Sequence, residues 1–172
     1  MIEVVSTVTI CTLESPLDLH YLSKNMESAI LPKKIGIWVK YRMKPENYFL
    51  IFYKSGKFLI TGIKSLERIN ATAQQALKLL ENAGIHCSIT KIAIANITCL
   101  GTLQLKTSLE KMVLYLDSGD VSYEPEQFPG LIYKNWGATF LIFSTGKVII
   151  TGVKDFEKAK ILFKKLEELI NL

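Results

Sequence analysis

The sequence is poor in the residues that build most catalytic and metal sites. Only two histidines, His20 and His86, occur among 172 residues, and neither has carboxylate or cysteine neighbours at ligand spacing. The patterns GxSxG, GxxxxGK[ST] and GxGxxG do not occur in it. We therefore expect a protein that is not an enzyme and that uses no cofactor and no metal.

Cysteine and long apolar runs are also scarce. Cys11, Cys87 and Cys99 are odd in number and far apart, which predicts three small apolar side chains rather than a disulfide framework or a CxxC site. The longest apolar stretches, such as 140–143, are too short to cross a membrane, and the N-terminus does not resemble a signal peptide. We expect a soluble, intracellular protein without a membrane partner.

What the sequence does contain is an internal repeat. The letters SGKFLITG at 55–62 return as TGKVIITG at 145–152, and strand-like residues at 2–8 are matched at 92–98. A period of about 90 residues that occurs only twice is too sparse for a solenoid, which needs at least three units. The pattern predicts a duplicated half-domain, with residues 1–90 as the first repeat and 91–172 as the second in one continuous domain.

Each half shows the same order of periodicities. Alternating Val, Ile and Thr predict a first strand, a helix follows, then three strands, and a helix closes the half. In the first half the Ser15-Pro16 pair predicts the start of the first helix. The strands expected in the first half are 2–10, 35–43, 48–53 and 58–61, with helices from Ser15 to about Ile30 and from Ser65 to about Asn82. Those of the second half are 92–100, 131–135, 138–143 and 147–151, with helices at 108–116 and from Asp155 onward. We predict an α+β fold made of two βαβββα units.

Two such units joined edge to edge would form one long antiparallel sheet with helices on one face. Both alternating residue sets of 48–53 and 139–143 are apolar or aromatic, so the uncovered face should be apolar as well, as interaction surfaces are. The net charge is +5, and residues 1–88 hold 11 Lys and Arg against 7 Asp and Glu. An apolar floor with a basic margin favours nucleic acid as the partner.

Two stretches of the second half carry a family resemblance: YEPEQFPGLIYK at 123–134 and LIFSTGKVIITG at 141–152. They resemble the second repeat of the TATA-box-binding protein family in its archaeal form. The first half resembles the family more loosely, through LPKK at 31–34, LIF at 50–52 and SGK at 55–57. The resemblance implies a saddle of ten antiparallel strands, with four helices on the convex side and DNA in the concave one.

The function implied by the resemblance is that of a general transcription initiation factor. Members bind the minor groove of TATA-box promoter DNA, bend it with apolar side chains wedged between base steps, and recruit transcription factor B and, indirectly, RNA polymerase. Such a protein would work in the cytoplasm of an archaeal cell, at the nucleoid, or in a eukaryotic nucleus. Two copies could pair through the apolar face when DNA is absent.

Wedge positions follow from the matching motifs. The resemblance places Phe128 and Phe143 at the two wedges of the second half, and Ile35 and Phe52 at those of the first. Counting forward from Pro45 favours Phe52, whereas counting back from Gly56 favours its neighbour Tyr53. Because a shift of one residue turns a strand side chain to the opposite face, the two counts exclude each other. We prefer Phe52 and expect the additional residue in the turn at 54–56.

The resemblance also implies three sets of contacts. On the floor of the minor groove, A·T and T·A pairs present the same hydrogen-bond acceptors, which amides, hydroxyls and small apolar groups would contact. The matching residues are Ser6, Val8, Leu50, Thr61, Asn96, Thr98, Leu141 and Thr151. Phosphates would be met by Arg42, Lys57, Lys134 and Lys147. Transcription factor B would contact the loop residues Glu124, Glu126 and Gln127.

Departures from the family pattern lie in the first half. Ser6 stands where the family has Asn, and a hydroxyl cannot bridge two acceptors as an amide can. Ile35 replaces the expected Phe. We expect weaker or asymmetric readout there. These departures keep open an alternative, in which a divergent relative uses the same fold as a protein-interaction or substrate-binding platform without TATA specificity.

Overall fold

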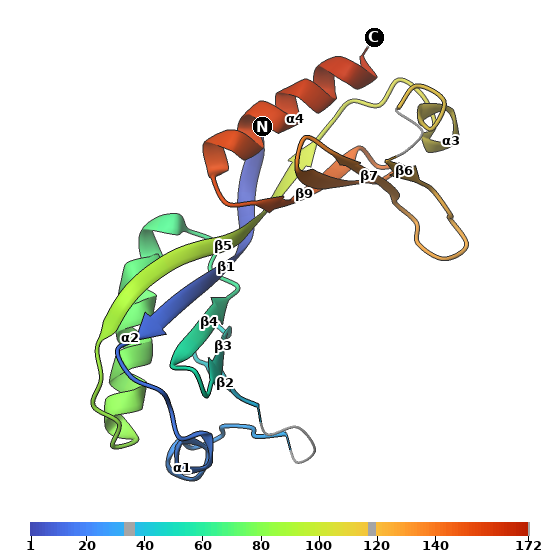
Figure 1. The fold of residues 1–172 in the computed structure, drawn as a ribbon. Helices are drawn as coiled ribbons and strands as arrows, with labels where there is room; N and C mark the ends of the chain where they lie inside the picture. The colour runs from blue at the N-terminus through green and yellow to red at the C-terminus, as the bar shows by residue number, and fades with distance from the viewer. Residues whose placement is uncertain (33–36, 117–119, 172) are drawn as a thin grey trace. The chain divides into compact units, whose positions relative to one another are not determined.

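The computed structural model describes residues 1–32, 37–116 and 120–171. Their strands form one nine-stranded sheet in the order β2-β3-β4-β1-β5-β9-β8-β7-β6 (Figure 1). The strands are β1 (Ile2–Leu13), β2 (Trp38–Met43), β3 (Tyr48–Tyr53), β4 (Lys57–Thr61), β5 (Ile89–Thr102), β6 (Val121–Ser122), β7 (Leu131–Asn135), β8 (Ala138–Ile142) and β9 (Lys147–Val153). The helices are α1 (Leu19–Asn25), η1 (Leu66–Arg68, a 3-10 turn), α2 (Ile69–Asn82), α3 (Leu109–Met112) and α4 (Phe156–Ile170).

The predicted α+β class and the single long antiparallel sheet are confirmed, with nine strands in the described part of the chain rather than ten. The chain divides into two compact units. The first unit comprises Ser6–Ala95, and the second comprises Asn96–Leu172 together with Met1–Val5. The division therefore falls inside β1 and inside β5. Residues 2–5 of β1 belong to the second unit, and residues 89–95 of β5 belong to the first.

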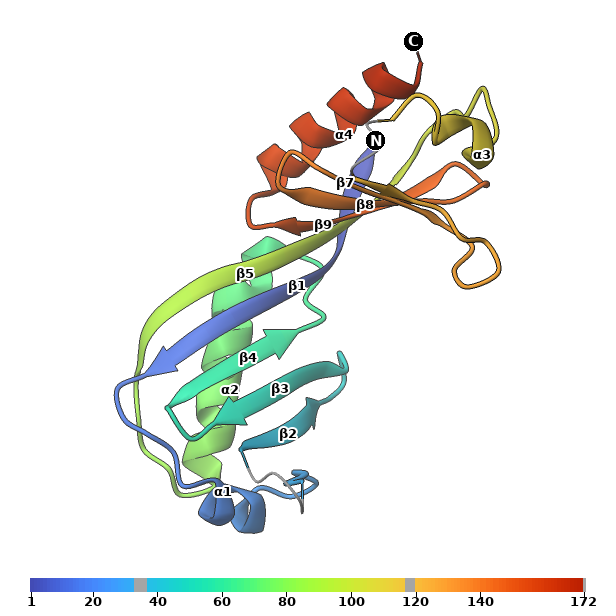
Figure 2. The ribbon, with the colours of Figure 1, turned by 45° about the vertical axis from the view of Figure 1, so that its right-hand side comes forward.

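The core of the first unit lies between its strands and α2, which runs behind them in Figure 2. Strict alternation along β3 and β4 sends every second side chain toward the helix. The helix supplies the small buried residues Ala73 and Ala76 to the same core as Phe52 and Phe58, whose ring centroids lie 5.3 Å apart. The residues on the opposite faces of the same strands are partly or fully exposed.

The second unit repeats the arrangement with α4, whose buried face consists of Ala159, Leu162, Phe163 and Leu166. Gly101 of β5 lies beneath this helix. A Cβ at that position would lie 2.5 Å from the Phe163 ring and 2.8 Å from Ile2, so only glycine allows Phe163 to sit against the strand. Buried residues again alternate along β8 and β9.

Two helices are shorter than the sequence predicts. α1 begins after Asp18, whose carboxylate accepts the backbone N–H groups of His20 and Tyr21 at 2.9 and 3.0 Å, and not at Ser15. The Tyr21 N–H is the main reason that the pKa of Asp18 is lowered. α3 spans only one turn of the expected 108–116. No helix of the described residues is both long and apolar enough to cross a bilayer.

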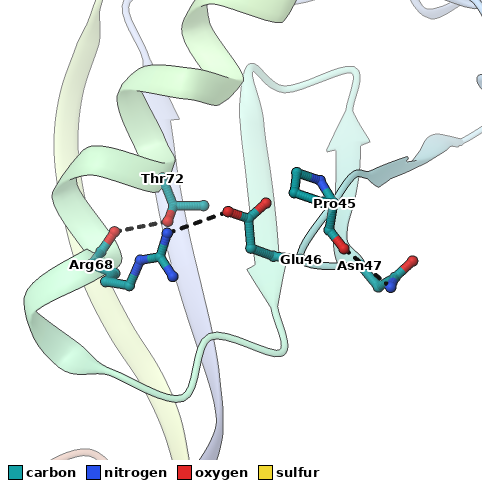
Figure 3. Close-up of polar contacts among 5 residues, drawn as sticks. All are labelled: Pro45, Glu46, Asn47, Arg68 and Thr72. Atoms are coloured by element: carbon teal, nitrogen blue, oxygen red, sulfur yellow. Dashed lines mark hydrogen bonds and ion pairs between the residues drawn. The ribbon is translucent and has the colours of Figure 1, made fainter.

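The β2–β3 hairpin is fastened to the beginning of α2. The Arg68 guanidinium donates to the Glu46 carboxylate at 3.3 Å, and the Thr72 hydroxyl donates to the Arg68 carbonyl at 2.8 Å (Figure 3). At the tip of the hairpin, the Asn47 side chain donates to the Pro45 carbonyl at 3.3 Å. Of these contacts, the Arg68–Glu46 ion pair joins the hairpin to the start of the helix, and the other two lie within the helix and within the turn.

Candidate nucleic-acid interface

We use the term open face for the side of each unit's strands that points away from α2 or α4. In the second unit it carries an aromatic pair. The rings of Phe128 and Phe143 meet edge to face, with centroids 5.8 Å apart and planes at 64°, and both are partly exposed. A Cβ on Gly130 would lie 2.7 Å from the Phe128 ring and 3.0 Å from the Phe143 ring. The two rings therefore occupy space that a side chain at position 130 would fill.

A polar cluster lies on the same face, where β5 meets β9. The Asn96 side-chain oxygen accepts the Gly152 backbone N–H at 2.8 Å, and its amide nitrogen donates to the Thr151 hydroxyl at 3.0 Å. The hydroxyls of Thr151 and Thr98 are 3.4 Å apart. The Asn96 amide nitrogen also donates to the Thr98 hydroxyl, at 3.4 Å. These bonds fix the amide in one orientation and gather an amide and two hydroxyls at one place on the open face.

A β-bulge creates this cluster. Ile97 pairs with Val153 and Cys99 pairs with Ile150, so one residue of β5 lies opposite two of β9, Thr151 and Gly152. The additional residue interrupts the ladder, which frees the Gly152 N–H for a side chain. Gly152 has a φ of +87°, which glycine adopts without strain. The backbone thus aims the Asn96 amide at the open face.

The corresponding region of the first unit is regular. Val8 pairs directly with Thr61, and the Gly62 N–H donates to the backbone carbonyl of Thr7 at 3.1 Å. Ser6 and Val8 lie on the open face, because the residues between and after them, Thr7 and Thr9, are fully buried. The units therefore present different chemistry: an anchored amide with two hydroxyls in one, and Ser6, Val8 and Thr61 in the other.

The predicted orientation of Phe52 and Leu50 is wrong. Both side chains are fully buried in the core of the first unit, on the helix side of β3. Tyr53, Ile51 and Phe49 occupy the open face instead. The reason is the strand register, in which Tyr53 precedes Gly56 by three residues just as Phe143 precedes Gly146. The glycine turn, and not Pro45, preserves the spacing that decides the face.

The other predicted wedge of the first half, Ile35, lies outside the described residues. Leu141 and Phe143 share the open face, because Phe140 and Ile142, which alternate with them, are buried. Thr61 and Thr151 lie on it by the same alternation. The structure thus brings together Asn96, Thr98, Leu141, Phe143 and Thr151 in the second unit.

The four predicted phosphate-binding side chains are exposed, and alternation along their strands places each on the open face. Lys57 is in phase with Thr61 on β4, and Lys147 is in phase with Thr151 on β9. Arg42 pairs with Phe49 and Lys134 pairs with Thr139. Lys40 shares the face of Arg42 and belongs to the basic margin that the sequence predicts, although the sequence alone did not assign it a phosphate contact. Sequence reasoning missed Trp38 on the same face; the alternation of 38–43 was the available signal.

The loop before β7 is compact and acidic. The Glu124 carbonyl accepts the backbone N–H groups of both Gln127 and Phe128 at 2.9 Å, and the Gln127 side chain donates to the Glu124 carboxylate. Glu124, Glu126 and Gln127 are all exposed. The turn that presents them thus also positions Phe128. Among the described residues, no three His, Cys, Asp or Glu side chains gather as they would around a metal ion.

The fold and its open face define an α+β protein that is built from two copies of one sheet-and-helix unit. The solved structure of Methanococcus jannaschii TBP is similar to it, with a TM-score of 0.86 and 30% identity over 99% of this chain and 98% of that one. TATA-box-binding protein C of Halobacterium salinarum is 34% identical over 78% of each chain. The TATA-box-binding protein of Sulfurisphaera tokodaii is 31% identical over 98% of this chain and 88% of its own.

The family model for transcription factor TFIID, or TATA-binding protein, matches residues 1–83 and 91–171. The chain therefore belongs to the TATA-binding protein family.

Proposed function

We propose that the protein is a general transcription initiation factor that binds the minor groove of TATA-box promoter DNA and bends it. The observation that carries the proposal is the partly exposed pair of Phe128 and Phe143, held over Gly130 on the same face as the anchored Asn96 amide. Membership of the family, for which wedge-driven minor-groove bending is the standard description, supports the same function.

The aromatic pair supplies the wedge. A base step that opens against a ring loses stacking free energy of a few kcal/mol, and the larger contact with bent DNA compensates for it. Phe143 directly follows β8 and is in contact with the Phe128 ring. Because the two rings are in contact, each restricts the movement of the other. Phe143 would therefore be supported when it is inserted between two bases.

The polar cluster supplies readout. The minor groove of an A·T pair offers only acceptors, N3 of adenine and O2 of thymine, whereas a G·C pair adds the guanine amino group. An amide N–H and two hydroxyls match the acceptors, and the guanine amino group would meet a donor. The Asn96 cluster thus suits A·T pairs. Lys134 and Lys147 on the same face suit the flanking phosphates, which position the protein without reading sequence.

The acidic loop suits a protein partner. Glu124 and Glu126 would repel phosphates, so we propose that they face a basic surface of transcription factor B, which in turn brings RNA polymerase to the promoter. The site of action would be chromosomal DNA, in the cytoplasm of an archaeal cell.

The test is resonance energy transfer on a short end-labelled duplex with a TATA element, compared with a G·C-rich duplex at near-physiological salt. The unmodified protein should shorten the end-to-end distance of the TATA duplex selectively. Phe143→Ala and Phe128→Ala should each lower affinity by about tenfold or more and reduce bending. The matched control is Phe156→Ala, which removes a partly exposed ring at the beginning of α4.

Unchanged bending in both phenylalanine variants would overturn the wedge mechanism. Equal, weak binding of both duplexes without bending by the unmodified protein would instead favour the alternative, a divergent relative that serves as a protein-interaction or substrate-binding platform.

A further inference from the structure

The two units differ in the outward residues of their hairpins. On β2, Trp38 lies opposite Tyr53 and Lys40 lies opposite Ile51. On β7, the position that matches Lys40 is Ile132, which lies opposite Leu141. Arg42 has a basic counterpart in Lys134. The first unit therefore carries one additional cation at a position that is apolar in the second.

This additional cation is held in place by an aromatic ring. The Lys40 ammonium lies 4.2 Å from the centroid of the Phe49 ring, and the Arg42 guanidinium lies 4.6 Å from it. In the second unit the residue that matches Phe49 is Thr139. The ion pairs among the described residues involve neither Lys40 nor Arg42. Both charges thus remain available to an anion above the open face.

A second difference lies at the edge of the same hairpin. Tyr53 matches Phe143, but it lies opposite Trp38, whereas Gly130 lies beside Phe143. Trp38 and Tyr53 are both partly exposed. Flat rings that carry a polar atom stack on sugars and bases of any sequence, because every base has a π-face.

The first unit has no equivalent of the hydrogen-bonded cluster of Asn96, Thr98 and Thr151 in the second unit. The Gly62 N–H is bound to the Thr7 carbonyl, so it cannot anchor a side chain at position 6 as Gly152 anchors Asn96. Val8 stands where Thr98 contributes a hydroxyl. The first unit instead presents the charges of Lys40 and Arg42 to phosphates and the rings of Trp38 and Tyr53 to bases and sugars.

We propose that the first unit holds DNA through charge, with Lys40 as a phosphate-binding side chain, and adds affinity with little sequence selectivity, while selectivity resides in the second unit. The inference rests on the proposed function and assigns a division of labour within it. It predicts that the two hairpins respond oppositely when their matching residues are exchanged.

The test measures the dissociation constant for TATA and G·C-rich duplexes over a series of salt concentrations. The variants are Lys40→Ile, Lys40→Gln as a milder neutral form, and the reciprocal Ile132→Lys. Each phosphate neutralised contributes a slope of about 0.9 to the logarithmic salt dependence. Both Lys40 variants should lower the slope by about this amount on both duplexes and leave the TATA preference unchanged. Ile132→Lys should raise the slope.

An unchanged slope in both Lys40 variants, or a lost TATA preference in them, would overturn the inference while leaving the proposed function intact. Absence of a TATA preference in the unmodified protein would overturn the proposed function itself. Thermal unfolding of each variant establishes that the fold is retained.

Discussion

The side-chain oxygen of Asn96 accepts the backbone N–H of Gly152 at 2.8 Å, across a bulge that the first unit lacks. This bond turns a flexible side chain into a fixed donor. Asn96→Ala should therefore cost little stability, about 0.5–1.5 kcal/mol, because the exposed Gly152 N–H can bind water instead. It should lower the preference for a TATA duplex over a G·C-rich one more strongly than the matched change Ser6→Ala.

The bond between Asn96 and Gly152 also predicts that Ser6→Asn does not create a second side chain that recognises A·T pairs. An amide at position 6 would find the Gly62 N–H already bound to the Thr7 carbonyl, so it would lack an anchor. We expect the TATA preference of Ser6→Asn to stay within about twofold of that of the unmodified protein, measured by competition between duplexes. A clear gain would mean that residue identity, and not the bulge, sets the difference between the units.

The orientation of β3 is tested by two adjacent residues. Phe52→Ala should destabilise the protein by about 3–5 kcal/mol, because it leaves a cavity against Phe58 and α2. Tyr53→Ala should change stability by less than about 0.5 kcal/mol and instead weaken DNA binding. Urea unfolding and duplex binding measured on both variants would separate the two roles, and the reverse outcome would restore Phe52 to the open face.

These neighbouring residues also show how far the sequence could be interpreted. The repeat, the order of elements and the positions of Phe128, Phe143 and Asn96 could be predicted, because their motifs are long and their turns contain glycine at fixed spacing. β3 was oriented wrongly, since both faces of Tyr48–Tyr53 are apolar and period-2 alternation then gives no direction, and the count from Pro45 was preferred to the one from Gly56. Only the ladder with β4 resolves it.

The bulge at Gly152 was also beyond sequence reasoning. TG follows three apolar residues at both 61–62 and 151–152, and both glycines have positive φ, yet only one of them is beside a bulge. The difference arises from pairing with β1 or β5, which are distant in sequence. The residues next to Gly62 and Gly152 therefore do not indicate which of the two lies beside a bulge.

Turn glycines give a prediction about stability. Gly56 and Gly146 have φ of +80° and +82°, and a Cβ would lie 2.2 Å from the Ser15 carbonyl oxygen and 2.3 Å from that of Leu103. Gly56→Ala and Gly146→Ala should each cost more than about 2 kcal/mol, since backbone strain adds to a clash with backbone atoms. Gly137→Ala is the control: its φ is +73°, but the nearest atom would be 3.8 Å away, so about 1 kcal/mol is expected from urea unfolding.

Two buried hydroxyls predict stabilising substitutions. Thr7 and Thr9 are fully buried, and their hydroxyls have no hydrogen-bond partner among the described residues. The matching residues of the second unit are Ile97 and Cys99, which shows that this position of the fold accepts apolar groups. Thr9→Val should raise the free energy of unfolding by about 0.5–1.5 kcal/mol. Thr12→Val, on the other face of β1, should have almost no effect, and destabilisation by Thr9→Val would contradict the prediction.

The cysteines predict the dependence of reactivity and stability on pH. Burial raises the pKa of Cys11 to about 12 and that of Cys99 to about 11, from an ordinary 9.0. Because only thiolates react rapidly, iodoacetamide at pH 8 should modify Cys87 alone in the folded protein and all three residues after unfolding. Burial and the nearby carboxylates of Glu14 and Glu81 also raise the pKa of Cys87, so its labelling should be slow, and Cys87→Ser should abolish it.

The sign of the pH effect follows from proton binding. Above about pH 9 the unfolded chain releases the Cys11 proton, whereas the folded chain keeps it until about pH 12, so the folded state binds more protons in this interval. The stability contributed by the neutral thiol is complete below pH 9 and is lost as the pH rises toward 12. Cys11→Val should flatten the decline in unfolding free energy between pH 9 and 11 relative to the unmodified protein. Equal slopes for the two proteins would show that the Cys11 thiolate is tolerated in the core, and labelling of Cys11 in the folded state at pH 8 would point the same way.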